Sequence, residues 1–152
     1  MTEKRSANPQ KFFGAEEKEK IVDSIREAEK ETSGEIRLHL EEKAKKDVMQ
    51  RAQEVFYKIG MSKTAGHNGV LIYMATADKQ FAIIGDKGIN ELVPENFWQD
   101  VVDDMVSHFK KDEFVEGICH GIIRIGEKLK DYFPYQRDDV DELPDDISFD
   151  KK

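Results

Sequence analysis

The sequence contains a single cysteine, Cys119, so no disulfide can form within its 152 residues. This excludes a small secreted scaffold held together by disulfides. No apolar run approaches the roughly 20 residues that a membrane-spanning helix needs. The first residues, MTEKRSANPQKFF, also lack the apolar centre of a signal peptide. We therefore expect a cytoplasmic protein with no direct membrane insertion.

The motifs of several common active sites are missing as well. The four histidines show neither HxxxH nor HExxH spacing, so the sequence does not predict a zinc site. The glycine-containing stretches GHNG and GDKG lack the spacing of a P-loop or a dinucleotide fingerprint, and there is no GxSxG motif. The net charge of −8 argues against binding to nucleic acid or to anionic membranes, since both repel a negative surface.

The residues that are present predict alternating helices and strands. Apolar side chains at helical spacing indicate helices over 15–31 and 47–59, the second capped by Asp47. EIRLHLEE, from residue 35, alternates apolar and polar side chains, which is typical of a strand with one buried face. The apolar runs 69–75 and 80–85 flank a short polar turn and predict a β-hairpin.

The rest of the domain is expected to be helical, with one helix following Pro94 and a last one opening at Asp112 and Glu113. In the last helix, Gly117 and Gly121 lie four residues apart and would allow close packing against a neighbour. This order predicts an α/β fold: a three-layer α/β/α sandwich with a small mixed sheet, made of one parallel crossover and one β-hairpin.

Three regions follow from this pattern: a flexible N-terminal segment over 1–11, one domain over 12–134, and an acidic C-terminal tail over 135–152. Two interpretations of the tail stay open. It is a disordered acidic segment, or it folds back with Leu143, Ile147 and Phe149 against the domain.

The expected topology brings distant polar residues together. Parallel strands start at the same edge of a sheet, so Glu35 and Asn68, at the starts of the first two strands, should be neighbours. The hairpin returns the third strand to that edge, where it ends at Gly85 and Asp86. We therefore expect Glu35, Asn68 and Asp86 to converge.

Two more carboxylates, Asp103 and Asp104, flank the apolar stripe of the helix after Pro94 and could reach the same rim. Clustered carboxylates repel one another unless a cation lies between them, and hard cations such as Ca²⁺ or Mg²⁺ prefer oxygen ligands. The alternative is that each acid is a solvated surface residue or a helix cap.

Five stretches of the sequence resemble the TPM domain family in collinear order. They are SGEIRLHL, AQEVFYKIGMSKTAGHNGVLIYMA, KQFAIIGDKGIN, FWQDVVDDMVSHFKKDEFVEGICHGI and LKDYFP, and the resemblance runs from about Phe12 to Pro134. It implies an α/β/α sandwich that binds a divalent cation, usually Ca²⁺. Carried over to this sequence, the acidic positions of the family's cleft correspond to Glu35, Asp86, Asp103 and Asp104, with Asn68 as an additional neighbour.

The resemblance leaves three functions open. The first is a cation-binding module, for Ca²⁺ or Mg²⁺, that acts through a protein partner. The second is a metal-dependent acid phosphatase of low specificity, as described for a plant relative in the thylakoid lumen, with Lys87 as a phosphate-binding residue. The third is an adaptor whose acidic tail recruits a basic partner. The sequence favours the first, because it carries no recognisable nucleophile motif.

Overall fold

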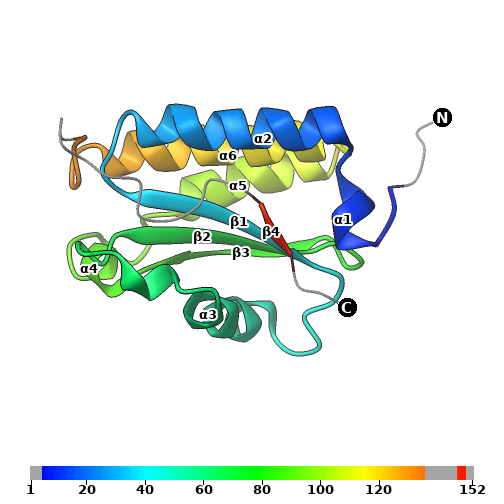
Figure 1. Ribbon diagram of the computed structural model, residues 1–152, viewed down its shortest axis with the longest axis horizontal. Coiled ribbons are helices and arrows are strands. Elements are labelled where there is room, and N and C mark those ends of the chain that lie inside the picture. The colour runs from blue at the N-terminus through cyan, green and yellow to red at the C-terminus, as the bar shows by residue number, and fades with distance from the viewer. Residues whose placement is uncertain (1–4, 136–146, 150–152) are drawn as a thin grey trace.

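The computed structural model describes residues 5–135 and 147–149, which form a sheet with helices on both faces (Figure 1). In chain order the elements are α1 (Pro9–Phe12), α2 (Ala15–Glu29), β1 (Glu35–Glu41), α3 (Val48–Lys58), the 3₁₀ turn η1 (Met61–Lys63), β2 (Gly69–Ala75), β3 (Gln80–Gly85), α4 (Lys87–Asn90), α5 (Gln99–Phe109), α6 (Phe114–Leu129) and β4 (Ser148–Phe149).

The sheet has the strand order β3-β2-β1-β4. β1 and β2 are parallel, with Glu35 opposite Gly69, and β2 and β3 are antiparallel, with Val70 opposite Gly85. The predicted parallel crossover and hairpin are therefore confirmed. β4 is an addition that the sequence did not predict, and it pairs in parallel with β1.

Helices cover both faces of the sheet, as the predicted three-layer sandwich requires. Figure 1 shows α2, α5 and α6 on one side of the strands and α3 on the other. The larger apolar core lies under the three helices and includes Leu38, Ile72 and Ile122. The smaller core joins α3 to the opposite face through Phe56 and Leu71. Among the described residues, no helix is long and apolar enough to cross a membrane.

Local sequence signals explain the start of α3 but not those of α4 and α5. The Asp47 carboxylate accepts hydrogen bonds from the backbone N–H groups of Met49 and Gln50, which fixes the start of α3 as predicted. The helix after Pro94 is shorter than expected, because residues 95–98 form a turn and α5 begins only at Gln99. The four-residue helix α4 was not predicted.

The described residues that precede α2 contact the rest of the domain. The flexible segment predicted over 1–11 stays a prediction; in its described part α1 begins at Pro9, which is buried. Arg5 makes a bidentate ion pair with Glu17 in α2 and donates to the carbonyl of Phe12. These contacts tie the N-terminal segment to the larger core.

The C-terminal residues 147–149 fold back on the domain, which confirms the second interpretation of the tail for these three residues. Ile147 is buried, and Phe149 lies opposite Leu40 in the β1–β4 pair. Leu143 lies outside the described residues.

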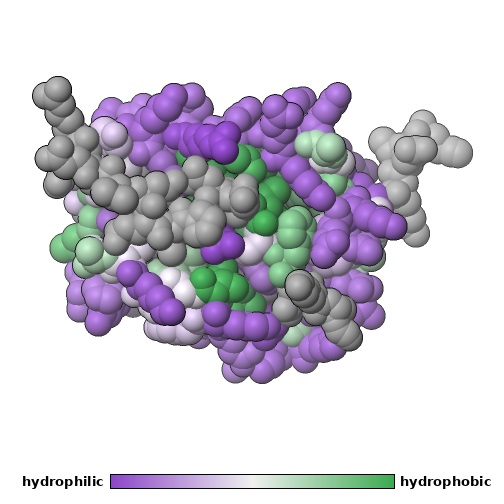
Figure 2. All heavy atoms as spheres, viewed as in Figure 1, coloured by the Kyte–Doolittle hydropathy of each residue, from purple (hydrophilic) through white to green (hydrophobic). Residues whose placement is uncertain are grey.

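On the face shown in Figure 2, hydrophilic side chains dominate the helices, and hydrophobic atoms are seen between them at the level of the sheet.

Both faces of β1 are buried, whereas the alternating pattern predicted one exposed face. The polar residues Glu35, His39 and Glu41 are all buried. The reason is the second helical layer together with β4, since His39 stacks on Tyr73 and its Nδ1 lies 2.7 Å from Ser148 Oγ. The alternation of apolar and polar residues therefore correctly indicated a polar face of β1, but that face is not exposed to solvent.

Candidate functional site

Three of the predicted residues meet at one edge of the sheet. Glu35 is the first residue of β1, and its N–H donates to the carbonyl of Asn68 at 3.2 Å. Asp86 follows the last residue of β3, and its N–H donates to the carbonyl of Gly69 at 2.9 Å. The backbone of β2 therefore lies between Glu35 and Asp86, and the expected convergence of Glu35, Asn68 and Asp86 is confirmed. We call these three residues the edge cluster.

The edge cluster holds buried side-chain oxygens without hydrogen-bond partners. Glu35, Asn68 and Asp86 are only 5, 6 and 4% exposed. Asp86 Oδ1 accepts from the Lys87 N–H at 2.8 Å, but Asp86 Oδ2 and Asn68 Oδ1 have no hydrogen-bond partner among the described residues. The Asn68 amide is oriented by its Nδ2, which donates to the carbonyl of Ser33. Each unpaired buried oxygen costs about 1–3 kcal/mol.

His67 is a neighbour of this cluster that sequence reasoning missed. Its Nδ1 lies 3.5 Å from Asp86 Oδ2, a distance too long for a good N–H···O hydrogen bond. The contact is therefore an ion pair only when the imidazole is protonated. His67 also adopts a left-handed backbone, with φ of 48°, which costs a non-glycine residue about 1 kcal/mol or more. The signal in the sequence that could have indicated His67 was its position directly before Asn68.

The short helix α4 closes the edge from one side. Asp86 caps it, and Gly88 packs directly on the preceding loop. A Cβ on Gly88 would lie 2.5 Å from the carbonyl oxygens of both Gly66 and His67. Only glycine permits this approach, so α4 fixes the loop that carries His67 and Asn68. The Lys87 side chain, the predicted phosphate ligand, is exposed beside Asp86.

Asp103 and Asp104 both lie on α5, and their place in the ligand set of the edge cluster stays a prediction. Asp103 accepts a hydrogen bond from Gln99 on the same helix. Among the residues that the structure describes, one group of His, Cys, Asp or Glu side chains places a donor atom from each of three members within 4.8 Å of the others. Its members are Asp104, His108 and His120. α5 packs on α6, and Asp104 lies near His120 of that helix.

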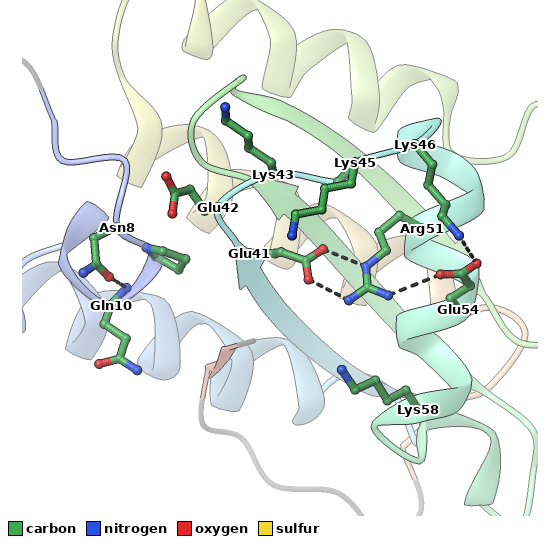
Figure 3. Close-up of a pocket in the computed structure, with 12 residues that line it drawn as sticks. Asn8, Gln10, Glu41, Glu42, Lys43, Lys45, Lys46, Arg51, Glu54 and Lys58 are labelled. Carbon is green, nitrogen blue, oxygen red and sulfur yellow. Dashed lines mark hydrogen bonds and ion pairs between the residues drawn. The ribbon is translucent and has the colours of Figure 1, made fainter. Parts of the chain in front are cut away.

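A hollow of about 740 Å³ lies at the end of β1 opposite the edge cluster (Figure 3). Lysines and glutamates from α3, the end of β1 and the segment after it line the hollow, together with Pro9 and Gln10 of α1. Glu41 makes a bidentate ion pair with Arg51, which also contacts Glu54, and Glu54 in turn pairs with Lys46. Much of the charge around this hollow is thus neutralised within the wall.

The same network reaches the sheet through Tyr73, whose hydroxyl donates to Glu41. Burial, together with the adjacent carboxylate, raises the pKa of Tyr73 well above its usual value. Tyr73 therefore stays protonated across the physiological range and acts as a hydrogen-bond donor. Its role here is to hold Glu41 in place at the end of β1.

Chemically, the edge cluster offers two carboxylates and an amide oxygen in a buried setting. Oxygen donors of this kind suit a hard cation such as Ca²⁺ or Mg²⁺, which would satisfy the unpaired Asp86 and Asn68 oxygens. The Asp104, His108 and His120 group mixes nitrogen and oxygen donors and belongs to a different chemistry. Its two histidines are 12 residues apart on separate helices, so no sequence spacing could reveal them.

Comparison with known proteins agrees with the fold and the sequence resemblance. The family model of the TPM domain matches residues 7–128. The NMR structure of the BA42 protein from the psychrophilic bacterium Bizionia argentinensis is 47% identical, with a TM-score of 0.88 over 95% of this chain and 100% of that one. A comparison with curated proteins found no match.

Two further solved structures share the fold at low identity. The N-terminal domain of a P. gingivalis protein is 14% identical, with a TM-score of 0.67 over 88% of this chain and 85% of that one. The N-terminal domain of a Corynebacterium glutamicum protein is 10% identical, with a TM-score of 0.61 over 92% and 81% of the two chains. The family match over most of the chain and the likeness to BA42 lead to one conclusion: this chain belongs to the TPM domain family.

Proposed function

We propose that the protein is a divalent-cation-binding module, for Ca²⁺ or Mg²⁺, with its site at the edge cluster of Glu35, Asn68 and Asp86. The observation that carries the proposal is the pair of buried oxygens, Asp86 Oδ2 and Asn68 Oδ1, that lack a hydrogen-bond partner among the described residues. Each is costly while unpaired. The Asn68 carbonyl accepts from the backbone N–H of Glu35, and Asp86 lies across β2 from Glu35 at the same edge. A bound cation offsets that cost.

The surroundings of the edge cluster support coupling between the ion and the nearby loop. His67, in its left-handed conformation, lies between Gly66 and Asn68, and the carbonyls of Gly66 and His67 contact α4. An ion held by Asn68 and Asp86 would fix both the loop and the start of α4. The module then presents a cation-dependent surface to a protein partner.

A Ca²⁺ titration followed by NMR and by thermal denaturation tests this proposal. We expect the amide signals of residues 35, 66–69 and 86–88 to shift, and the fold to gain about 2.7 kcal/mol at a free Ca²⁺ concentration of 100 times Kd. Asp86→Asn should abolish both effects. Asp78→Asn is the matched control, because Asp78 is exposed in the turn at the other end of β3.

The outcome that contradicts the proposal is equally direct. No shift and no stabilisation at millimolar Ca²⁺ or Mg²⁺ would rule out a cation site of useful affinity at this edge. Full binding by Asp86→Asn would rule out this residue as a ligand. Parallel titrations with the two ions identify the one that the site prefers.

The second candidate is a metal-dependent phosphatase, favoured by one observation: the exposed Lys87 side chain stands beside Asp86. A cation at the edge cluster would activate water and neutralise phosphoryl oxygens, and Lys87 would hold the phosphate. Turnover of p-nitrophenyl phosphate that requires the cation and is lost in both Asp86→Asn and Lys87→Ala would support this activity. Turnover that survives these changes would point to a contaminant.

A further inference from the structure

Three side chains on α5 and α6 form a second, chemically distinct group. Asp104 and His108 are one turn apart on α5, and His120 lies on α6. One donor atom from each lies within 4.8 Å of the others, and His108 Nε2 is 3.1 Å from His120 Nδ1. We call Asp104, His108 and His120 the helix-pair cluster.

Close packing of the two helices sets the spacing of the helix-pair cluster. A Cβ on Gly117 would lie 3.0 Å from the Cβ of His108, and one on Gly121 would lie 2.6 Å from Met105 Sδ. These two glycines let α5 approach α6 far more closely than larger residues would. Met105 is fully buried at the contact, so the backbone positions of His108 and His120 are fixed by the core.

Glu113 orients His108. Its Oε1 lies 2.8 Å from His108 Nδ1, and its backbone N–H donates to the carbonyl of His108. Because a carboxylate only accepts, Nδ1 carries the proton, and in the neutral ring Nε2 keeps its lone pair. That lone pair faces His120. Metal-bound histidines typically donate one ring N–H to a carboxylate and bind the metal through the other ring nitrogen.

The spacing of the two histidine nitrogens matches that of a metal centre. Two imidazole nitrogens bound to one tetrahedral Zn²⁺ at about 2.0–2.1 Å lie about 3.3 Å apart, close to the 3.1 Å between His108 and His120. His120 is exposed, while Asp104 and His108 are partly buried, so an ion can enter from solvent and water can fill the remaining position.

We propose that Asp104, His108 and His120 bind a divalent transition-metal ion of the Zn²⁺ class, with Glu113 as a positioning residue. Two imidazole nitrogens and one carboxylate oxygen suit Zn²⁺, and also Cu²⁺ and Ni²⁺, whereas Ca²⁺ and Mg²⁺ prefer oxygen alone. The helix-pair cluster is therefore separate in position and in ion preference from the edge cluster.

A Zn²⁺ titration of the full chain tests the proposal, with calorimetry for affinity and ring ¹⁵N NMR for the ligands. We expect the ring nitrogens of His108 and His120 to shift on Zn²⁺ addition, and an excess of Ca²⁺ not to displace the ion. His108→Gln and His120→Gln should each lower the affinity at least about tenfold. Asp104→Asn, which keeps the side-chain shape, should also weaken binding.

Asp103→Asn is the matched control, because Asp103 neighbours Asp104 on α5 but contacts Gln99 instead. It should bind Zn²⁺ as the wild type does. Zn²⁺ that leaves both ring signals unshifted at millimolar concentration would overturn the proposal, as would wild-type affinity in both histidine variants. The spectrum of each ion-free variant establishes that it is folded before titration.

The positioning role of Glu113 is tested by a separate measurement. In the ion-free protein the ring ¹⁵N shifts should show His108 protonated at Nδ1, and Glu113→Ala should remove this preference and lower the affinity about tenfold. Glu113→Gln keeps an accepting oxygen and should restore part of both effects. An unchanged tautomer and affinity in Glu113→Ala would refute the positioning role.

Discussion

Gly88→Ala tests how α4 holds the loop beside the edge cluster. The new methyl group would lie 2.5 Å from two backbone carbonyl oxygens, those of Gly66 and His67, and 3.1 Å from the His67 carbonyl carbon. A carbon–oxygen contact normally needs about 3.3 Å or more, so the overlap is about 0.8 Å at each oxygen. Neither oxygen sits at the end of a flexible side chain, and the backbone itself must move.

Overpacking of this kind typically costs about 1–3 kcal/mol. The higher helix propensity of alanine recovers little in a helix of four residues. We expect the free energy of unfolding to fall by about 2 kcal/mol, which lowers the Tm by about 4–8 °C for a chain of this size. Urea denaturation and thermal melts measure both quantities. The amide signals of residues 66–69 should shift as the loop moves.

Gly14→Ala is the control for this substitution. A Cβ on Gly14 would meet its nearest neighbour, Glu17 Oε1, at an ordinary 3.9 Å. Gly14 caps α2, where alanine is somewhat less suitable, so a loss below about 1 kcal/mol is expected. A Gly88→Ala protein within about 0.5 kcal/mol of the wild type would refute the close approach of α4 to the loop.

Three further predictions concern the rest of the fold. Ile147→Ala should lower the free energy of unfolding by about 2 kcal/mol in urea, because Ile147 is 9% exposed; an unchanged value would contradict the docking of residues 147–149. Tyr73→Phe should cost about 1–2 kcal/mol through the lost hydrogen bond to buried Glu41, and equal urea midpoints would refute it. Arg5 lowers the pKa of Glu17 below its usual 4.5, so the ion pair stabilises the fold above that pH and is lost as pH falls through the lowered value. Thermal melts between pH 6 and 3 should show that the wild type loses more stability on acidification than Glu17→Gln does, by at most about 1 kcal/mol. Parallel curves of stability against pH for the two proteins would contradict this.

The edge cluster was accessible to sequence reasoning because it depends on strand direction alone. The helical crossover from β1 to β2 and the hairpin turn set the relative directions of the three strands, and these directions bring Glu35, Asn68 and Asp86 to one edge. No side-chain packing had to be known. The sequence could not predict that the Asp86 and Asn68 oxygens are unpaired. That depends on which hydrogen-bond donors of the loop and of α4 lie near them in the folded protein.

The helix-pair cluster lies beyond sequence reasoning for a geometric reason. Side chains on a helix advance by about 100° per residue, so the partner of Asp104 depends on how α5 is rotated against α6. The sequence indicated that Asp104 could reach the sheet rim, but it gave no sign that Asp104 lies near His120 on α6. Gly117 and Gly121 predicted a close helix contact, but not that it would bring His108 to His120.

The sequence alone thus determined strands β1 to β3 and the four long helices, the parallel crossover, the hairpin and the edge at which Glu35, Asn68 and Asp86 meet. These follow from local periodicity and chain direction. Only the tertiary structure decided that β4 pairs with β1, that the polar face of β1 is buried, and that Asp104 lies with two histidines. Each of these depends on contacts between residues far apart in the chain. Such contacts are chosen by the packing of whole elements, and no short stretch of sequence encodes them.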